Sequence, residues 1–167
     1  MRVIGIDPGI AITGYSVIEE CGSGPRLINS GCIFTSQELS AASRLAAIHD
    51  RILELISAHT PQAMVVEKIF FSKNVRTAFQ VGEARGVIIL AAAKSNLELY
   101  EYTPLQVKQA VAGYGNAEKA QIQKVVQILL GLAKPPAVDD EADAMAVALC
   151  YLQNRRWLEA VKGGGRV

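Results

Sequence analysis

The chain has 167 residues, of which 50% are hydrophobic and 20% are charged, and its formal net charge is +1. This length suits one domain whose core needs no disulfide or structural metal. We expect that domain to span residues 1–154, followed by a mobile tail at 155–167. The hydrophobic runs are too short to cross a bilayer. The first residues lack the pattern of a secretion signal, and the three cysteines are scattered. We therefore expect a cytoplasmic protein with reduced thiols and no membrane association.

The charge is unevenly distributed along the chain. Residues 1–67 carry a net charge of −3, residues 68–134 carry +5, and residues 135–167 carry −1. A basic central segment can bind a polyanion locally while the total stays near zero. A solvated mixed surface gives the same pattern, and the total charge is low for a protein that binds DNA. The charge distribution is therefore weak support for nucleic-acid binding.

The predicted elements follow from the local residue pattern, taken in chain order. Runs of β-forming residues predict strands at 2–6, 13–18 and 26–34, and their tight connections favour an antiparallel meander. Apolar residues at helical spacing predict a helix at 40–59, and the apolar strand at 63–66 is expected to run parallel after this crossover. We then expect a helix at 74–94, a strand at 97–102, and helices at 104–112, 117–130 and 139–151. This order predicts an α/β fold with a five-stranded mixed sheet flanked by helices.

Carboxylates occur at three places where an apolar pattern ends. Asp7 follows the first strand in an Asp-Pro-Gly turn, Glu67 directly follows the fourth strand, and residues 139–143 read Asp-Asp-Glu-Ala-Asp. If the first and fourth strands are neighbours, Asp7 and Glu67 lie near each other at the carboxyl edge of the sheet. Asp140 and Asp143 are three residues apart, so they share one face of a helix. The pattern therefore predicts four converging carboxylates.

Ordinary structural roles explain several of these acids. Asp7 could cap its own turn. Acids in the first turn of a helix are favoured by the macrodipole, with Asp139 as the N-cap and Glu141 facing solvent. Asp143 lies beyond that turn, where capping does not explain it. Four converging carboxylates repel one another unless a cation lies among them. Oxygen ligands without a Cys or His cluster favour Mg²⁺ or Mn²⁺, and two such ions about 3.5–4 Å apart suit phosphodiester cleavage.

Five short motifs occur in order across residues 2–151. They read Gly-Ile-Asp-Pro-Gly at 5–9 with Gly-Tyr at 14–15, Val-Val-Glu at 65–67 followed by Phe70, Val-Lys-Gln at 107–109, Ala-Glu-Lys at 117–119, and Asp-x-x-Asp-Ala at 140–144. Each motif alone is weak. The set, with these intervals, resembles the RuvC family of bacterial Holliday junction resolvases.

The resemblance implies a ribonuclease H-like fold, a homodimer, and Mg²⁺-dependent nicking of two symmetric strands of a four-way DNA junction, giving 5′-phosphate and 3′-hydroxyl ends. It implies that the catalytic carboxylates and metal ligands are Asp7, Glu67, Asp140 and Asp143, although some family members have His at the position of Asp140. It also implies a catalytic role for Lys119, which could neutralise charge on the transferring phosphoryl group. The family acts in recombination and DNA repair with the RuvA and RuvB branch-migration proteins.

The resemblance also implies where DNA binds. Lys108 and Lys119 correspond to basic positions near the scissile phosphates, and Phe70 corresponds to an aromatic residue at the junction centre, where its ring could stack on unpaired bases. From the pattern alone, a core position is the more common role for such a Phe. Lys73 and Arg76 are candidates for contacts to backbone phosphates, which position DNA without reading its sequence.

Gly82 and Gly86 are one turn apart in a predicted helix. Because each glycine weakens a helix by about 1 kcal/mol relative to alanine, the pair indicates close packing of another backbone. That backbone could belong to the same chain or to a second copy. We expect a dimer interface, because a two-fold enzyme would match a two-fold junction.

Two other functional classes share part of this pattern. Actin-like ATPases and sugar kinases place an amino-terminal Asp-x-Gly hairpin around nucleotide phosphates, but they need a second domain and a second such loop, which 167 residues do not provide. A junction-binding protein that has kept the fold without catalysis is the other alternative. Binding that persists without metal-dependent cleavage would identify it.

Overall fold

The computed structural model describes the backbone of residues 1–68 and 75–163 and the side chains of residues 1–68 and 78–155. The strands are β1 (Arg2–Asp7), β2 (Ile12–Cys21), β3 (Gly24–Phe34), β4 (Ala63–Glu67) and β5 (Glu98–Tyr102). The helices are α1 (Ala41–His59), α2 (Val75–Lys94), α3 (Pro104–Ala112), α4 (Lys119–Leu129) and α5 (Asp139–Gly163).

The predicted elements are all present, and the largest difference is at the carboxyl end. Helix α5 continues to Gly163, whereas the apolar pattern predicted a helix that ends at residue 151. Residues 155–163 of the predicted tail are therefore helical. The mobility of the tail stays a prediction.

The five strands form one mixed sheet in the order β3-β2-β1-β4-β5. Strand β2 pairs antiparallel with both β1 and β3, whereas β4 pairs parallel with both β1 and β5. The predicted meander and the predicted parallel crossover strand are both confirmed. Because β1 and β4 are neighbours, residues that follow them reach the same edge of the sheet.

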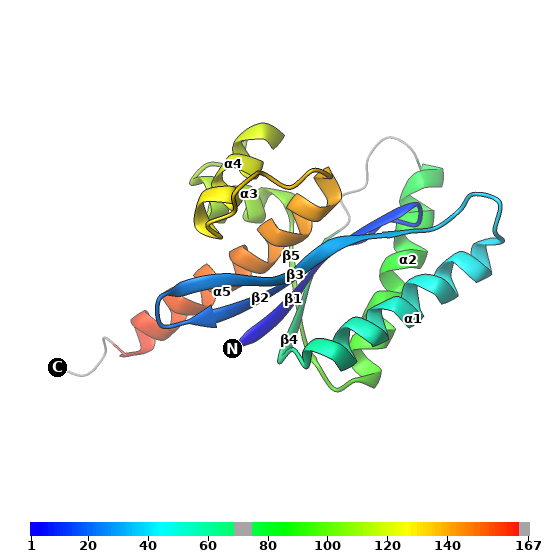
Figure 1. The fold of residues 1–167 in the computed structure, drawn as a ribbon, viewed down its shortest axis with the longest axis horizontal. Coiled ribbons are helices and arrows are strands. Elements are labelled where there is room, and N and C mark those ends of the chain that lie inside the picture. Colours follow the sequence, from blue (N-terminus) through cyan, green and yellow to red (C-terminus); the bar gives the residue numbers. More distant parts are fainter. Residues whose placement is uncertain (69–74, 164–167) are drawn as a thin grey trace.

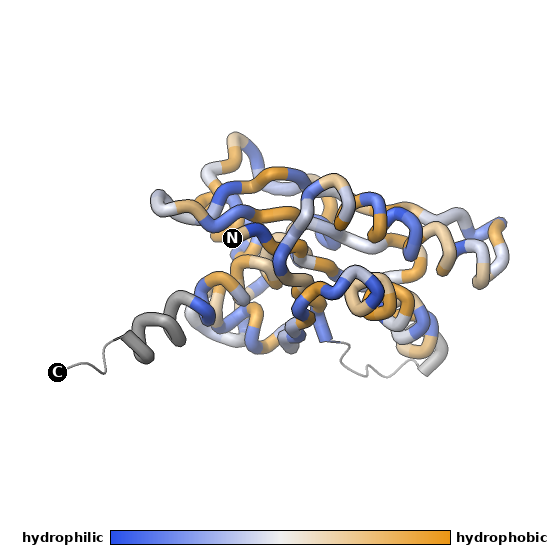
Figure 2. The backbone as a smooth tube through the Cα atoms, turned by 90° about the horizontal axis from the view of Figure 1, so that it is seen from below, coloured by the Kyte–Doolittle hydropathy of each residue, from blue (hydrophilic) through white to orange (hydrophobic). Residues whose placement is uncertain are grey.

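Helices cover both faces of the sheet, with α1 and α2 on one side and α3, α4 and α5 on the other (Figure 1). Successive side chains of a strand point to opposite faces. Ile4 and Ile6 of β1 accordingly pack in the core with α1 and α2, and Val3 packs in the core with α5. Hydrophobic residues recur along the strands and along the helices beside them (Figure 2). No helix in the described part of the chain is long and apolar enough to cross a membrane.

Helix α5 lies directly on the sheet because small residues line its path. A Cβ atom at Gly14 would overlap the carbonyl oxygen of Asp140, and one at Gly5 would overlap the carbonyl oxygen of Ala144. Between them, the buried hydroxyl of Ser16 donates a hydrogen bond of 2.9 Å to the same Ala144 oxygen. These contacts fix the height of the first turns of α5 above β1 and β2.

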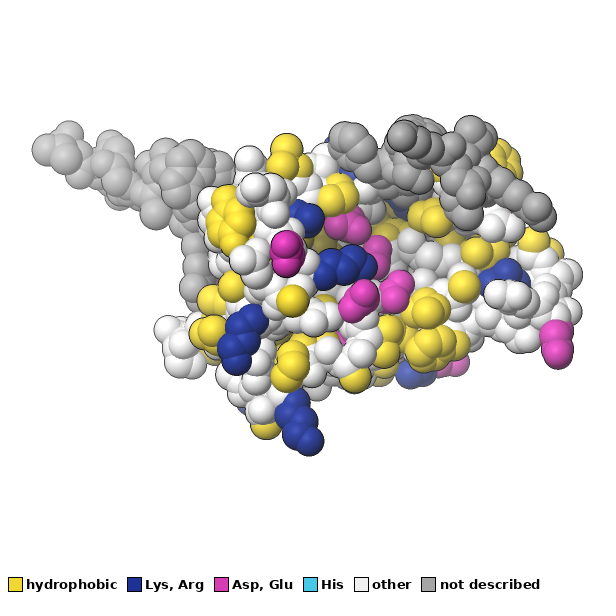
Figure 3. Space-filling model, turned by 90° about the horizontal axis from the view of Figure 1, so that it is seen from above, with side chains coloured by type: hydrophobic (Ala, Val, Ile, Leu, Met, Phe, Trp, Pro, Cys, Tyr) yellow, Lys and Arg dark blue, Asp and Glu magenta, His cyan; other side chains and the backbone are white. Residues whose placement is uncertain are grey.

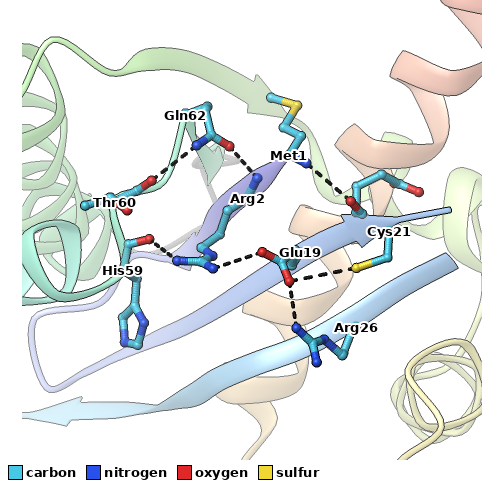
Figure 4. A network of polar contacts seen from close by, with 9 residues as sticks. Met1, Arg2, Glu19, Cys21, Arg26, His59, Thr60 and Gln62 are labelled. Atoms are coloured by element: carbon cyan, nitrogen blue, oxygen red, sulfur yellow. Dashed lines mark hydrogen bonds and ion pairs between the residues drawn. The ribbon is translucent and has the colours of Figure 1, made fainter. Parts of the chain in front are cut away.

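A polar network ties the other end of β1 to its surroundings (Figure 4). The Arg2 guanidinium donates to the carbonyl oxygen of His59 at the end of α1 (2.7 Å) and to Oε1 of Glu19 on β2 (2.9 Å). Arg26 on β3 donates to the second oxygen of Glu19 (2.8 Å). Three strands and one helix are therefore held together at the amino end of β1, and Asp7 lies at the opposite end.

Candidate active site

Asp7 and Glu67 lie side by side at the carboxyl edge of the sheet. Ile6 of β1 pairs with Val66 of β4 in parallel register, and the two acids are the next residues along. By the alternation of strand side chains, Asp7 follows Val3 and Gly5 on the face that α5 covers. The carboxyl groups of Asp7 and Glu67 share a hydrogen bond. The predicted meeting of these two residues is therefore observed.

The start of α5 brings Asp140 and Asp143 to the same place. Both side chains are half-buried, and α5 rests on β1 and β2 just above Asp7. Burial raises the pKa of Asp7, and the charges of Glu67, Asp143 and Asp140 raise it further. These effects place the other three predicted carboxylates within electrostatic reach of Asp7.

The pKa values of two other acids are also raised. For Glu67 the main cause is burial, followed by the charge of Asp143, while the hydrogen bond with Asp7 and the charges of Lys119 and Lys108 act in the opposite direction. For Asp143 the main cause is again burial, opposed by Lys119. Without a cation, the acids are therefore held at a cost in free energy.

These residues fit a hard divalent cation. In residues 1–68 and 78–155, no three acids, histidines or cysteines are gathered closely enough to form a ready-made metal site. The donor set nevertheless consists of carboxylate oxygens alone, which are the ligands that Mg²⁺ and Mn²⁺ prefer. A cation would also relieve the repulsion that raises the pKa of Asp7.

Two lysines border the carboxylates. Lys108 comes from α3 and is half-buried, and its charge acts on both Glu67 and Asp143. Lys119 is the first residue of α4, and its Nζ lies 4.0 Å from Oδ2 of Asp143. Seen from above, acidic side chains gather beside a basic one near the centre of this face (Figure 3). The two predicted lysines, Lys108 and Lys119, therefore lie at the same site as the predicted carboxylates.

Two acids of α5 differ from their predicted roles. Asp139 does not precede the helix as an N-cap but is its first residue, and its carboxylate contacts Lys119 of α4 instead. Glu141, which was expected to face solvent, is half-buried and accepts a hydrogen bond of 2.6 Å from Ser30 of β3. Each acid has a partner that is distant in sequence, which the local pattern of a helix start does not reveal.

The sequence patterns did not identify the residues that let α5 pack closely against the sheet. Gly5, Gly14 and Ser16 are small residues on one face of β1 and β2, and all three contact the backbone of α5. A glycine within a strand often marks the close approach of another backbone. That signal was present at both glycines, although it does not say which helix would fill the space.

The remaining predicted residues are placed only in part. Phe70 and Lys73 lie outside the described residues. Arg76 belongs to α2, but its side chain is not among those described. Gly82 and Gly86 are also on α2, and no described atom lies within 4 Å of a Cβ built at either position. Within the described part of the chain, these glycines therefore have no internal neighbour that needs their small size.

Comparisons with known proteins identify the family. The family model described as Crossover junction endodeoxyribonuclease RuvC matches residues 3–151. A protein of that description from Halothermothrix orenii is 50% identical over 161 residues, which cover 94% of this chain and 98% of that protein. The structure of Thermus thermophilus RuvC superposes with a TM-score of 0.88 at 38% identity, covering 94% of this chain and 96% of that one. The structure of T. thermophilus RuvC in complex with a Holliday junction substrate gives a TM-score of 0.86 at 35% identity, with the same coverage. The fold is thus the ribonuclease H-like fold of these proteins, and the chain belongs to the RuvC family of crossover junction endodeoxyribonucleases.

Proposed function

We propose that this chain resolves four-way DNA junctions by nicking two symmetric strands, as a Mg²⁺-dependent phosphodiester hydrolase in recombination and DNA repair. The observation that carries the proposal is the meeting of Asp7, Glu67, Asp140 and Asp143 at one edge of the sheet, in a chain of this family. A protein that only binds junctions has no need to hold four acids at a cost in free energy.

The carboxylates of the site would hold the metal ions, and its lysines would bind the phosphates. Asp7, Glu67, Asp140 and Asp143 would hold two Mg²⁺ ions, with Mn²⁺ as a substitute. When bound, such ions activate a water molecule and neutralise the leaving oxygen in phosphodiester cleavage, giving a 5′-phosphate and a 3′-hydroxyl. Asp7 is central, because it neighbours both Glu67 on β4 and the acids of α5. Its hydrogen bond with Glu67 keeps the two carboxyl groups side by side, where both would face a bound cation.

The lysines act on the substrate. Lys119 lies beside Asp143 at the border of the carboxylates, where an ammonium would neutralise charge that develops on the phosphoryl group. Lys108, on the neighbouring helix α3, would bind an adjacent phosphate. Lys73 and Arg76 would extend this phosphate binding, and Phe70 would stack at the junction centre. The role of Phe70 rests on the family, and the roles of Lys73 and Arg76 rest on their charge.

A homodimer is the assembly that we propose for this enzyme. Phe79, Gly82, Gly86 and Leu90 follow one another at helical spacing on α2, with Phe79 70% and Leu90 47% exposed. This apolar face with open space above the glycines suits a second copy of the same helix. Two sites related by a two-fold axis would nick equivalent strands. We place this dimer in the cytoplasm, where it would work with RuvA and RuvB.

The test uses a labelled synthetic four-way junction and a linear duplex with the same arms, each with Mg²⁺ or with EDTA. We expect symmetric nicks in the junction only, dependent on Mg²⁺ and absent with Asp7→Asn. Junction binding without nicks in Mg²⁺ or Mn²⁺, across several central sequences, would instead identify the non-catalytic binding protein. Equal nicking of the four-way junction and the linear duplex would refute the proposed substrate.

A further inference from the structure

One carboxylate at the border of the site contacts α4 and not the other acids. Lys119 is the first residue of α4, and Gln123 follows one turn later on the same face. Asp139, the first residue of α5, binds both: its Oδ2 lies 3.2 Å from Lys119 Nζ, and its Oδ1 accepts a hydrogen bond of 2.9 Å from Gln123 Nε2. Asp139 therefore joins the starts of two helices.

Lys119 has few other contacts that could fix its position. Its side chain is 66% exposed, its stem is long and flexible, and its ammonium lies near the positive end of the α4 dipole, which disfavours a cation. Asp143, the other ion-pair partner found among the described residues, is farther away, at 4.0 Å. Asp143 is also a proposed metal ligand, so its charge would be shared with a cation when the site is loaded.

We infer that Asp139 is a positioning residue that holds the Lys119 ammonium at the edge of the carboxylate site, where it meets the phosphoryl group of the substrate. This inference rests on the proposed function, which gives Lys119 its role in nicking. Asp139 is not itself a further metal ligand, because both of its oxygens are bound by α4 side chains. Gln123 orients the carboxylate, and the carboxylate orients the lysine.

The inference predicts opposite effects on DNA binding and on reaction rate. Asp139→Asn removes one negative charge close to the bound phosphates, so junction affinity should stay equal or rise. The same variant releases Lys119, so the rate of nicking within the bound complex should fall. We expect a fall of about two- to five-fold, because that factor in rate corresponds to the free energy of one exposed ion pair. A general effect of charge would improve binding without slowing the reaction.

Single-turnover nicking of the four-way junction at saturating enzyme measures that rate. Asp139→Glu keeps a carboxylate and should restore most of it. In a Lys119→Ala background, which is itself slow, Asp139→Asn should cause no further loss, because the two residues act through one contact. The matched control is Glu141→Gln, which removes one charge from the same helical turn and keeps an oxygen to accept from Ser30. It should nick at the wild-type rate.

A second readout needs neither metal nor DNA. Competitive acetylation in EDTA, followed by mass spectrometry, compares Lys119 with Lys124, whose Nζ contacts only the neutral side chain of Gln127 among the hydrogen bonds described. Asp139→Asn should raise the labelling of Lys119 relative to Lys124 about two- to five-fold, and Glu141→Gln should leave the ratio unchanged. An unchanged ratio in Asp139→Asn would mean that the carboxylate does not hold the lysine.

The outcomes separate this inference from the proposed function. If the wild-type protein nicks junctions and Asp139→Asn does so at the same rate, the positioning role is refuted and the resolvase function stands. The positioning role is also refuted if Asp139→Asn lowers the nicking rate by the same factor in the wild-type and Lys119→Ala backgrounds. The effect of Asp139 would then not depend on the lysine. If the wild-type protein fails to nick junctions in Mg²⁺ or Mn²⁺, both the function and the inference are overturned.

Discussion

Asp7→Asn should stabilise the metal-free protein while it abolishes nicking. In the folded chain, burial and then the charges of Glu67, Asp143 and Asp140 raise the pKa of Asp7, whereas in the unfolded chain it returns to 3.8. An asparagine has the same shape and no charge, and its amide can donate a hydrogen bond to Glu67. The substitution therefore removes repulsion and keeps the hydrogen bond.

The size of the effect follows from linkage. The pKa of Asp7 rises to about 9 in the folded chain, and a difference of one in pKa corresponds to about 1.4 kcal/mol. Because the buried site can relax, we expect the free energy of unfolding to rise by only about 2–3 kcal/mol in Asp7→Asn at neutral pH. An acid with a raised pKa binds its proton more tightly in the folded state. Stability of the wild-type protein therefore falls as pH rises from 3.8 toward the raised value, and the variant escapes this loss. The difference between the two proteins should shrink toward pH 4.

Urea unfolding in EDTA at about pH 5 and about pH 7.5 tests this reasoning. The control is Asp50→Asn, because the Asp50 side chain on α1 is 74% exposed and its loss should change stability by less than about 0.5 kcal/mol. Added Mg²⁺ should stabilise the wild-type protein and not Asp7→Asn. If Asp7→Asn is less stable than the wild type at the higher pH, or if its gain is the same at both pH values, the ionisation of Asp7 does not destabilise the fold.

Three further predictions concern the carboxylate site, the packing of α5 on the sheet and the dimer. Glu67→Gln and Asp143→Asn should each abolish Mg²⁺-dependent nicking and leave junction binding equal or tighter in gel-shift assays, and retained nicking would remove that residue from the metal site. Ser16→Ala should lower the free energy of unfolding by about 0.5–1.5 kcal/mol, because it removes one buried hydrogen bond to a carbonyl oxygen that keeps its partner within α5, and urea unfolding measures this. Gly86→Arg should convert a dimer into a folded monomer in light scattering, whereas Ala58→Arg on an exposed part of α1 should not. An unchanged mass for Gly86→Arg would place the interface elsewhere.

The fold and most of the site were predictable because their signals are local. Each strand has its own β-forming run, and the parallel crossover to β4 followed from the helix before it. Once β1 and β4 are neighbours, the position of Asp7 and Glu67 directly after them brings the two acids together. The spacing of Asp140 and Asp143 places both on one face of α5, whatever the helix packs against.

The sequence alone could not assign contacts between distant segments. Asp139 has the pattern of an N-cap, and nothing near it in sequence reveals that α4 would present Lys119 and Gln123 at that point. The hydrogen bond between Ser30 and Glu141 is a second example, because these residues are 111 positions apart. A glycine within a strand is compatible with the close approach of another backbone, but only the packing of the helices identifies α5 as the neighbour of Gly5 and Gly14.

The site depends on backbone contacts that the acids themselves do not make. The carboxylates repel one another, so their proximity must be imposed by the rest of the fold. Gly5 and Gly14 let α5 approach the sheet, and Ser16 fixes its backbone there. Substitution of an acid should therefore spare the fold and remove the chemistry. A Cβ at Gly14 would push against the carbonyl of Asp140, so even Gly14→Ala should move the acids of α5 away from Asp7 and lose both stability and nicking.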